Sequence, residues 1–132
     1  MKNTKNVLRG KEIVLGVRAS IAAYKAAEIV RLLKKEGAGV TVVMRPASRH
    51  FIGKITFSSL TGRPVYVEMF ENQEWEESHI PLAKKADIVM VAPASADIIA
   101  KLAQGIADNL LSTLILATKA PVLIAPAMHG SM

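Results

Sequence analysis

The stretch "GVRASIAAYKAAEIV" is the first part of the sequence with residues suited to ligand binding, and it begins at Gly16 after an apolar run. Four consecutive backbone N–H groups would lie free at the start of the following helix, those of Arg18, Ala19, Ser20 and Ile21. Such groups form a site for an anion, and the Arg18 guanidinium would add a positive charge. The turn lacks both the GxGxxG motif and the GxxxxGK[ST] phosphate loop. A structural turn with an exposed arginine is the alternative.

A second candidate turn lies in "VAPASADIIAKLAQG". Pro93 ends a predicted buried strand, and Ala94 leaves room for a ligand to approach the backbone. Ser95 and Asp97 are of the types that cap a helix N-terminus. A capped helix without a ligand explains the same residues, so this turn alone does not define a site.

Three histidines are candidates for acid–base chemistry or metal binding, namely His50, His79 and His129. Their spacing contains no HxxxH or similar pattern and the chain has no cysteine, so we predict no metal site. His129 follows an apolar strand beside Met128, and methionines there fill a core more often than they line a ligand site. A lone histidine is likewise more often a surface or core residue than a catalytic one.

Composition and charge limit the class of protein. With 132 residues, 51% of them hydrophobic, the chain is long enough for one domain with a buried core. Residues 1–63 hold 13 lysines and arginines against 3 acidic residues, and residues 64–132 hold 4 against 8. Few aromatics and no nucleic-acid motif favour small anionic ligands over nucleic acid. No signal peptide is recognisable and no apolar run reaches the roughly 20 residues of a membrane span, so we expect a soluble, cytoplasmic protein.

The elements that must position these turns alternate between strand and helix. Residues 1–11 form a basic tail. Apolar runs predict strands over 12–17, 39–44, 87–92 and 121–126, and a weaker pattern covers 64–70. Helices are predicted over 20–36, 46–51, 79–86, 95–105 and 109–118, while 55–62 is ambiguous. The helix over 20–36 has Ser20 as its N-cap, Gly37 as its stop, and an apolar stripe of Ile21, Ala22, Ile29, Leu32 and Leu33.

Apolar strands that alternate with helices predict a parallel sheet covered on both faces. Right-handed crossovers make this a doubly wound, three-layer α/β fold. Ligands of such sheets bind beyond the carboxyl ends of the strands. That rule selects four turns as candidates for ligand binding, namely 16–20, 44–48, 92–97 and 126–132.

Three blocks of the sequence together resemble the flavin-dependent cysteine decarboxylase family, and within it most closely the phosphopantothenoylcysteine decarboxylases. They are "GVRASIAAYKAAEIVRLLKKEGAGVTVVM", "SHIPLAKKADIVMVAPASADIIAKLAQGIADNLLSTLILAT" and "PVLIAPAMHGSM", and the resemblance covers residues 12–132. It implies a Rossmann-like, flavodoxin-like flavoprotein fold with FMN as cofactor. The implied reaction is the decarboxylation of 4'-phosphopantothenoylcysteine to 4'-phosphopantetheine in coenzyme A biosynthesis.

The resemblance also implies which positions contact FMN. They are Gly16, Arg18, Ala19, Ser20, Ile21, Arg45, Ser48, Pro93, Ala94, Ser95 and Met128. The family has small or hydroxyl residues where this chain has Arg18 and Arg45. These arginines either supply charge to the FMN phosphate or hinder FMN by their bulk, and the sequence leaves both open.

Two catalytic positions follow from the same resemblance. His79 matches the family's active-site histidine in "SHIxLAKxAD". A histidine just before a helix start feels the positive end of the helix dipole, which favours the neutral imidazole that accepts a proton. His129 stands where the family has the asparagine of "PAMN", which contacts the substrate carboxylate, and histidine can also donate a hydrogen bond.

Partners are implied as well. The family forms homotrimers, often built up to dodecamers, and is often joined to a synthase domain, either fused or separate. Family members continue into a substrate clamp that carries a cysteine, so we expect 12–132 to be an FMN-binding decarboxylase domain truncated before that clamp. A non-catalytic or regulatory FMN-binding relative and a peptidyl-cysteine decarboxylase are the alternative functions.

Overall fold

The computed structural model describes residues 7–17, 24–44, 53–67, 81–94, 99–100, 103–105, 114–115 and 117–126. In this part of the chain five strands form one parallel sheet in the order β3-β2-β1-β4-β5. The strands are β1 (Glu12–Val17), β2 (Gly39–Met44), β3 (Tyr66–Val67), β4 (Ile88–Ala94) and β5 (Val122–Pro126). The helices are α1 (Tyr24–Lys35) and α2 (Lys54–Thr61). The predicted parallel α/β fold is confirmed.

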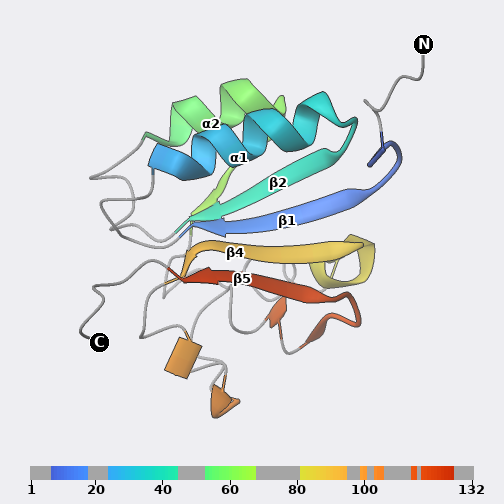
Figure 1. The fold of residues 1–132 in the computed structure, drawn as a ribbon, viewed down its shortest axis with the longest axis vertical. Coiled ribbons are helices and arrows are strands. Elements are labelled where there is room, and N and C mark those ends of the chain that lie inside the picture. The colour runs from blue at the N-terminus through green and yellow to red at the C-terminus, as the bar shows by residue number, and fades with distance from the viewer. Residues whose placement is uncertain are drawn as a thin grey trace.

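Each face of the sheet carries its own apolar core, because successive side chains of a strand point to opposite faces. Ile13, Leu15 and Val17 of β1 pack with Ala26 of α1 and Phe57 of α2, and Figure 1 shows both helices on this side of the sheet. The opposite face joins Val14, Val43, Val89 and Val91 to Leu82, Ala83 and Leu114. The sheet is therefore the middle of three layers.

Helix α1 ends in a hydrogen-bonded cap that the sequence signals at Gly37. Gly37 has a positive φ of 92°, which glycine adopts without steric cost. Its N–H donates to the Lys34 carbonyl at 3.0 Å, and the Ala38 N–H donates to the Leu33 carbonyl at 3.1 Å. This pair of bonds is the Schellman motif, which satisfies the last carbonyls of the helix and turns the chain into β2.

The apolar stripe predicted for α1 is partly wrong. Leu32 is 52% exposed, whereas Ala26 and Val30 are fully buried. At about 100° per residue, Leu32 lies about 120° from Ala26 around the helix axis, outside the face that contacts the sheet. Ile29 and Leu33 do pack against the core as predicted.

Most of the predicted elements agree with the structure where it describes the chain. The ambiguous segment 55–62 is helix α2, which ends where Gly62 adopts a φ of 70° and its N–H donates to the Ser58 carbonyl at 2.9 Å. The weak strand at 64–70 contains β3, with 68–70 outside the described residues. Residues 81–85 are helical, as are the described residues 99–100, 103, 114–115 and 117. The helix predicted over 46–51 lies outside the described residues.

Candidate functional site

The strands that precede the four predicted turns end side by side. β2, β1, β4 and β5 are consecutive neighbours in the sheet, and all run parallel, so their carboxyl ends share one edge (Figure 1). Val17 pairs with Met44, and Ala94 pairs with Pro126. At about 4.8 Å between neighbouring strands, the four ends span about 14 Å. The turns thus start within the reach of one extended small molecule.

The strand order reverses between β1 and β4. From β1 the chain proceeds to β2 and β3 on one side, and from β4 it proceeds to β5 on the other. Ala26, after β1, belongs to the core on one face, whereas Ile99, after β4, packs against the core on the opposite face. The connections therefore leave β1 and β4 toward opposite faces, which is the switch point where ligands bind in doubly wound sheets.

Small residues and an irregular strand mark this part of the edge. Gly16, next to the end of β1, pairs with Val43 on one side and Val91 on the other. In β4 the register to β5 shifts between Val91 and Ala94, so that β4 contains one extra residue. Pro93 lies within this irregularity and has no N–H to donate to the ladder. The bulge bends the backbone at the end of β4, and because β4 continues through Ala94, the first three residues of the turn predicted over 92–97 belong to the strand.

The structure places only part of the predicted site. Gly16 lies in β1, and the backbones of Pro93 and Ala94 lie in β4. The remaining predicted positions fall outside the described residues, and these are Arg18, Ala19, Ser20, Ile21, Arg45, Ser48, His79, Ser95, Met128 and His129. No group of three or more metal-ligating side chains occurs among the described residues.

The helical segment that follows His79 is held in place on the second face of the sheet. Leu82 and Ala83 are buried in that core. The Thr118 hydroxyl donates to the Ala83 carbonyl at 2.9 Å and accepts a hydrogen bond from the Ala120 N–H at 3.1 Å. Segment 81–85 is thereby joined to the chain that leads into β5.

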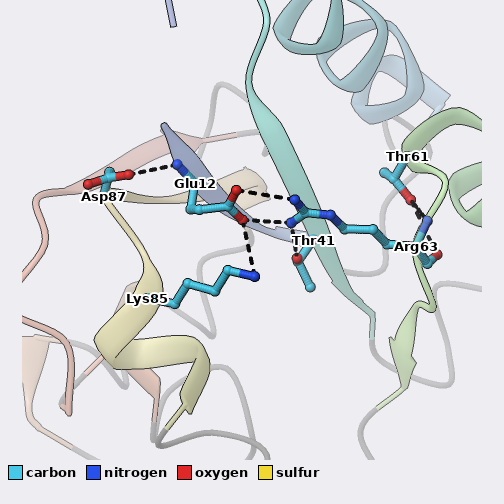
Figure 2. Close-up of polar contacts among 6 residues, drawn as sticks. All are labelled: Glu12, Thr41, Thr61, Arg63, Lys85 and Asp87. Carbon is cyan, nitrogen blue, oxygen red and sulfur yellow. Dashed lines mark hydrogen bonds and ion pairs between the residues drawn. The ribbon is translucent and has the colours of Figure 1, made fainter. Parts of the chain in front are cut away.

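Sequence reasoning missed a polar cluster at the opposite, amino-terminal edge of the sheet (Figure 2). The Arg63 guanidinium forms two hydrogen bonds to the Glu12 carboxylate, at 2.7 and 3.1 Å. It also donates to the Thr41 hydroxyl at 3.0 Å, and the Lys85 ammonium lies 3.7 Å from the same carboxylate. Glu12 and Arg63 are 51 residues apart in sequence, so no local spacing indicates the pair.

The same glutamate is bonded to the start of β4 through its backbone. The Glu12 N–H donates to the Asp87 carboxylate at 2.7 Å, and the Asp87 N–H donates to the Glu12 carbonyl at 2.7 Å. Gly39 lies beside the cluster, and a Cβ at this position would overlap the Glu12 and Arg63 side chains. A larger residue at the start of β2 would therefore require the ends of the Glu12 and Arg63 side chains to move.

Charge pairing shifts the pKa values of both partners. The hydrogen bonds from Arg63 hold the pKa of the Glu12 carboxyl below its ordinary value, and the Arg63 and Lys85 charges add to this against the opposing effect of burial. In turn, the hydrogen bond to Glu12 raises the pKa of Arg63. Both groups stay charged through neutral pH.

Comparison with known proteins identifies the family to which this chain belongs. The flavoprotein family model matches residues 1–132. The coenzyme A biosynthesis bifunctional protein CoaBC of Vibrio cholerae is 51% identical over 126 residues, and that of Escherichia coli K12 is 47% identical over 126 residues. The alignments cover 95% of this chain but only 32% and 31% of those proteins, so the chain spans about a third of their length.

Solved structures agree with this match. The FMN-dependent cysteine decarboxylase SpaF superposes with a TM-score of 0.82 and 27% identity, covering 95% of this chain and 73% of that one. A mutant PPC decarboxylase complexed with pantothenoylaminoethenethiol superposes with a TM-score of 0.74 and 30% identity, covering 92% of this chain and 69% of that one. The chain belongs to the flavoprotein family. Among the described residues, no helix is long and apolar enough to cross a membrane.

Proposed function

We propose that this chain binds FMN at the carboxyl edge of its sheet and catalyses the decarboxylation of 4'-phosphopantothenoylcysteine to 4'-phosphopantetheine. The observation that carries the proposal is the β1/β4 switch point, flanked by the ends of β2 and β5. The 51% identity to a coenzyme A biosynthesis protein and the similarity to PPC decarboxylase support this substrate.

The residues at this edge fit a flavin nucleotide. Gly16 and Ala94 are small residues on the two strands at the switch point, which favours close approach of a planar ring to the backbone. Arg18 and Arg45 each follow a member of the Val17–Met44 register pair, so they begin their turns from neighbouring positions. We assign these two guanidinium groups to the anionic phosphate of FMN, which arginine recognises through charge-assisted hydrogen bonds.

Further FMN contacts are proposed at the remaining positions of the four turns. They are Ala19, Ser20 and Ile21 after β1, Ser48 after β2, Pro93 and Ser95 around the end of β4, and Met128 after β5. Free N–H groups in the first of these turns add donors for an anion, and the serine hydroxyls can donate further hydrogen bonds. Met128 would supply apolar contact to the ring.

The substrate needs a redox cofactor, because direct loss of carbon dioxide from a cysteine carboxylate leaves a carbanion without an electron sink. Bound FMN would accept two electrons from the thiol-bearing carbon, which provides this sink, and would return them after carbon dioxide leaves, so that the net reaction to 4'-phosphopantetheine is redox-neutral. His79, two residues before the helical segment at Pro81, is the proposed acceptor of the thiol proton. His129 donates a hydrogen bond to the substrate carboxylate and orients it until carbon dioxide leaves.

Assembly and location belong to the same proposal. We propose a cytoplasmic homo-oligomer, a trimer or a dodecamer, joined to a fused or separate synthase domain. The exposed apolar side chains of edge strand β5 support an oligomer, because another subunit could cover them. They are Val122, Leu123 and Ile124, which are 37%, 57% and 36% exposed. Sedimentation equilibrium measures the subunit number, and a monomer at all concentrations would contradict the oligomer.

Substrate comparison tests the activity directly. The FMN-loaded protein is incubated with 4'-phosphopantothenoylcysteine or with a peptide that ends in cysteine, and carbon dioxide release is measured. Release from the phosphorylated substrate alone is expected. Release from the peptide alone would identify a peptidyl-cysteine decarboxylase, and flavin binding without release from either would identify a non-catalytic relative.

A further inference from the structure

We infer that Glu12, Arg63 and Asp87 act together as positioning residues for the FMN turns, although they lie at the opposite edge of the sheet. They fix how the two halves of the sheet meet along the β1/β4 seam, which we define as the four register pairs from Ile13–Ile88 to Gly16–Val91. The inference rests on the proposed FMN site.

The seam joins the two parts of the sheet that carry the proposed cofactor turns. β1, β2 and β3 lie on one side of it, and β4 and β5 lie on the other. Its carboxyl end is the Gly16–Val91 pair, beside the bulge in β4. A small change in how β1 and β4 meet therefore changes the spacing between the turns after β1 and those after β4.

At the amino end of the seam, Glu12 connects the two halves of the sheet through hydrogen bonds to Asp87 on one side and to Arg63 on the other. Its backbone exchanges two hydrogen bonds with Asp87, each 2.7 Å long, and Asp87 directly precedes β4. Its carboxylate is held by the Arg63 fork, and that fork also bonds to Thr41 of β2 (Figure 2). Arg63 itself is fixed by its N–H, which donates to the Thr61 hydroxyl at 3.1 Å at the end of α2.

The geometry of these bonds makes the connection stiff. A bidentate arginine–carboxylate pair restrains orientation as well as distance. The Glu12 and Arg63 side chains are only 24% and 30% exposed, so solvent screens them less than a surface pair. The Arg31–Glu28 pair on α1 is as short, at 2.7 Å, but its side chains are 56% and 62% exposed and three residues apart on one helix.

The sign of the expected effect separates positioning from direct electrostatics. Glu12 and the end of β1 at Val17 are five residues apart, about 17 Å along a strand. The Arg63 and Lys85 charges lie 2.7 and 3.7 Å from the Glu12 carboxylate and largely cancel its field at that distance, so the direct effect of the Glu12 charge on an anionic cofactor is small. Removing that negative charge would, if anything, strengthen binding of an anion. Positioning predicts weaker binding.

The test compares Glu12→Gln and Arg63→Lys with the matched control Glu28→Gln, which makes the same chemical change in an exposed ion pair. FMN dissociation constants are measured by flavin fluorescence at a temperature where every variant is folded. We expect Glu12→Gln to bind FMN roughly three- to tenfold more weakly, Arg63→Lys to change in the same direction, and Glu28→Gln to match the wild type.

A second readout needs no cofactor. In the FMN-free protein, the backbone amide NMR signals of Gly16 and Val91 are expected to shift in Glu12→Gln and Arg63→Lys but not in Glu28→Gln. The inference is overturned if these signals and the FMN affinity are unchanged while only thermal stability falls. If the wild type binds no FMN, the proposed function fails, and the amide signals alone decide the inference. Arg63→Lys keeps the test valid if Glu12→Gln does not fold.

Discussion

Val17 and Met44, the last residues of β1 and β2, lie opposite each other in register and are both fully buried. In the sequence an arginine follows each of them, Arg18 after Val17 and Arg45 after Met44. In the proposed site both guanidinium groups would face the FMN phosphate, and repulsion between two neighbouring positive charges would favour binding of an anion.

The first prediction concerns these arginines. Arg18→Ala and Arg45→Ala are each expected to weaken FMN binding roughly tenfold, because each removes a charge-assisted hydrogen bond to the phosphate. Isothermal titration measures the change, and Arg31→Ala, which removes an exposed arginine of α1, serves as control. Tighter FMN binding in either variant would mean that the guanidinium hinders the cofactor.

The second prediction concerns His79. His79→Asn is expected to reduce carbon dioxide release from 4'-phosphopantothenoylcysteine by about 100-fold or more, because a general base contributes at least that factor. FMN binding should be retained, as shown by the visible spectrum. His50→Asn removes a histidine without an assigned role and should retain turnover. Undiminished turnover in His79→Asn would exclude this residue as the base.

The third prediction concerns the stability supplied by Arg63. Arg63→Ala is expected to lower the free energy of unfolding by about 1–3 kcal/mol, because it leaves the partly buried Glu12 carboxylate without its hydrogen bonds. Urea denaturation measures this difference. Arg31→Ala breaks an exposed pair on one helix and is expected to change stability far less. Equal effects of the two substitutions would mean that the Glu12 pair is only a surface contact.

The fourth prediction concerns pH. Glu12 has a lowered pKa in the folded protein, so its contribution is complete above the ordinary value of about 4.5 and is lost as the pH falls through the folded-state value. The stability of the wild type should therefore fall more steeply than that of Glu12→Gln as the pH decreases from about 4.5. Denaturation at a series of pH values gives the two curves, and parallel curves would contradict the assignment.

The fifth prediction concerns close packing at Gly39. Gly39→Ala is expected to destabilise the fold by about 1–3 kcal/mol, because its Cβ would overlap Glu12 and Arg63. Thermal unfolding compares Gly39→Ala with the wild type. A Gly39→Ala protein as stable as the wild type would show that the Glu12 and Arg63 side chains move aside without cost.

The main strands could be predicted from the sequence because their signal is local. The apolar runs at 12–17 and 39–44 coincide with β1 and β2, and the alternation of strands with helices gave the parallel sheet. The end of α1 could also be predicted from a local signal, because Gly37 itself supplies the positive φ that the cap needs. Leu32 was misplaced because helical spacing allows several stripes, and only the packed sheet selects one of them.

The amino-edge cluster could not be predicted, because its members come from separate elements. Glu12 begins β1, Arg63 precedes β3 and Asp87 precedes β4, and the sheet order brings them together. The candidate site could be predicted in part from the sequence. The topological rule predicted which strand ends would meet, and Val17 and Met44 do lie side by side, as do Ala94 and Pro126. The side chains beyond them stay predictions.

The most direct test of the account is the site of FMN binding. Backbone amide NMR signals are followed while FMN is added to the protein. We predict saturable shifts at Gly16, Met44 and Ala94, at the carboxyl ends of β1, β2 and β4, with little change at Glu12 and Asp87. No shift with excess FMN, or shifts confined to the amino edge, would contradict the account.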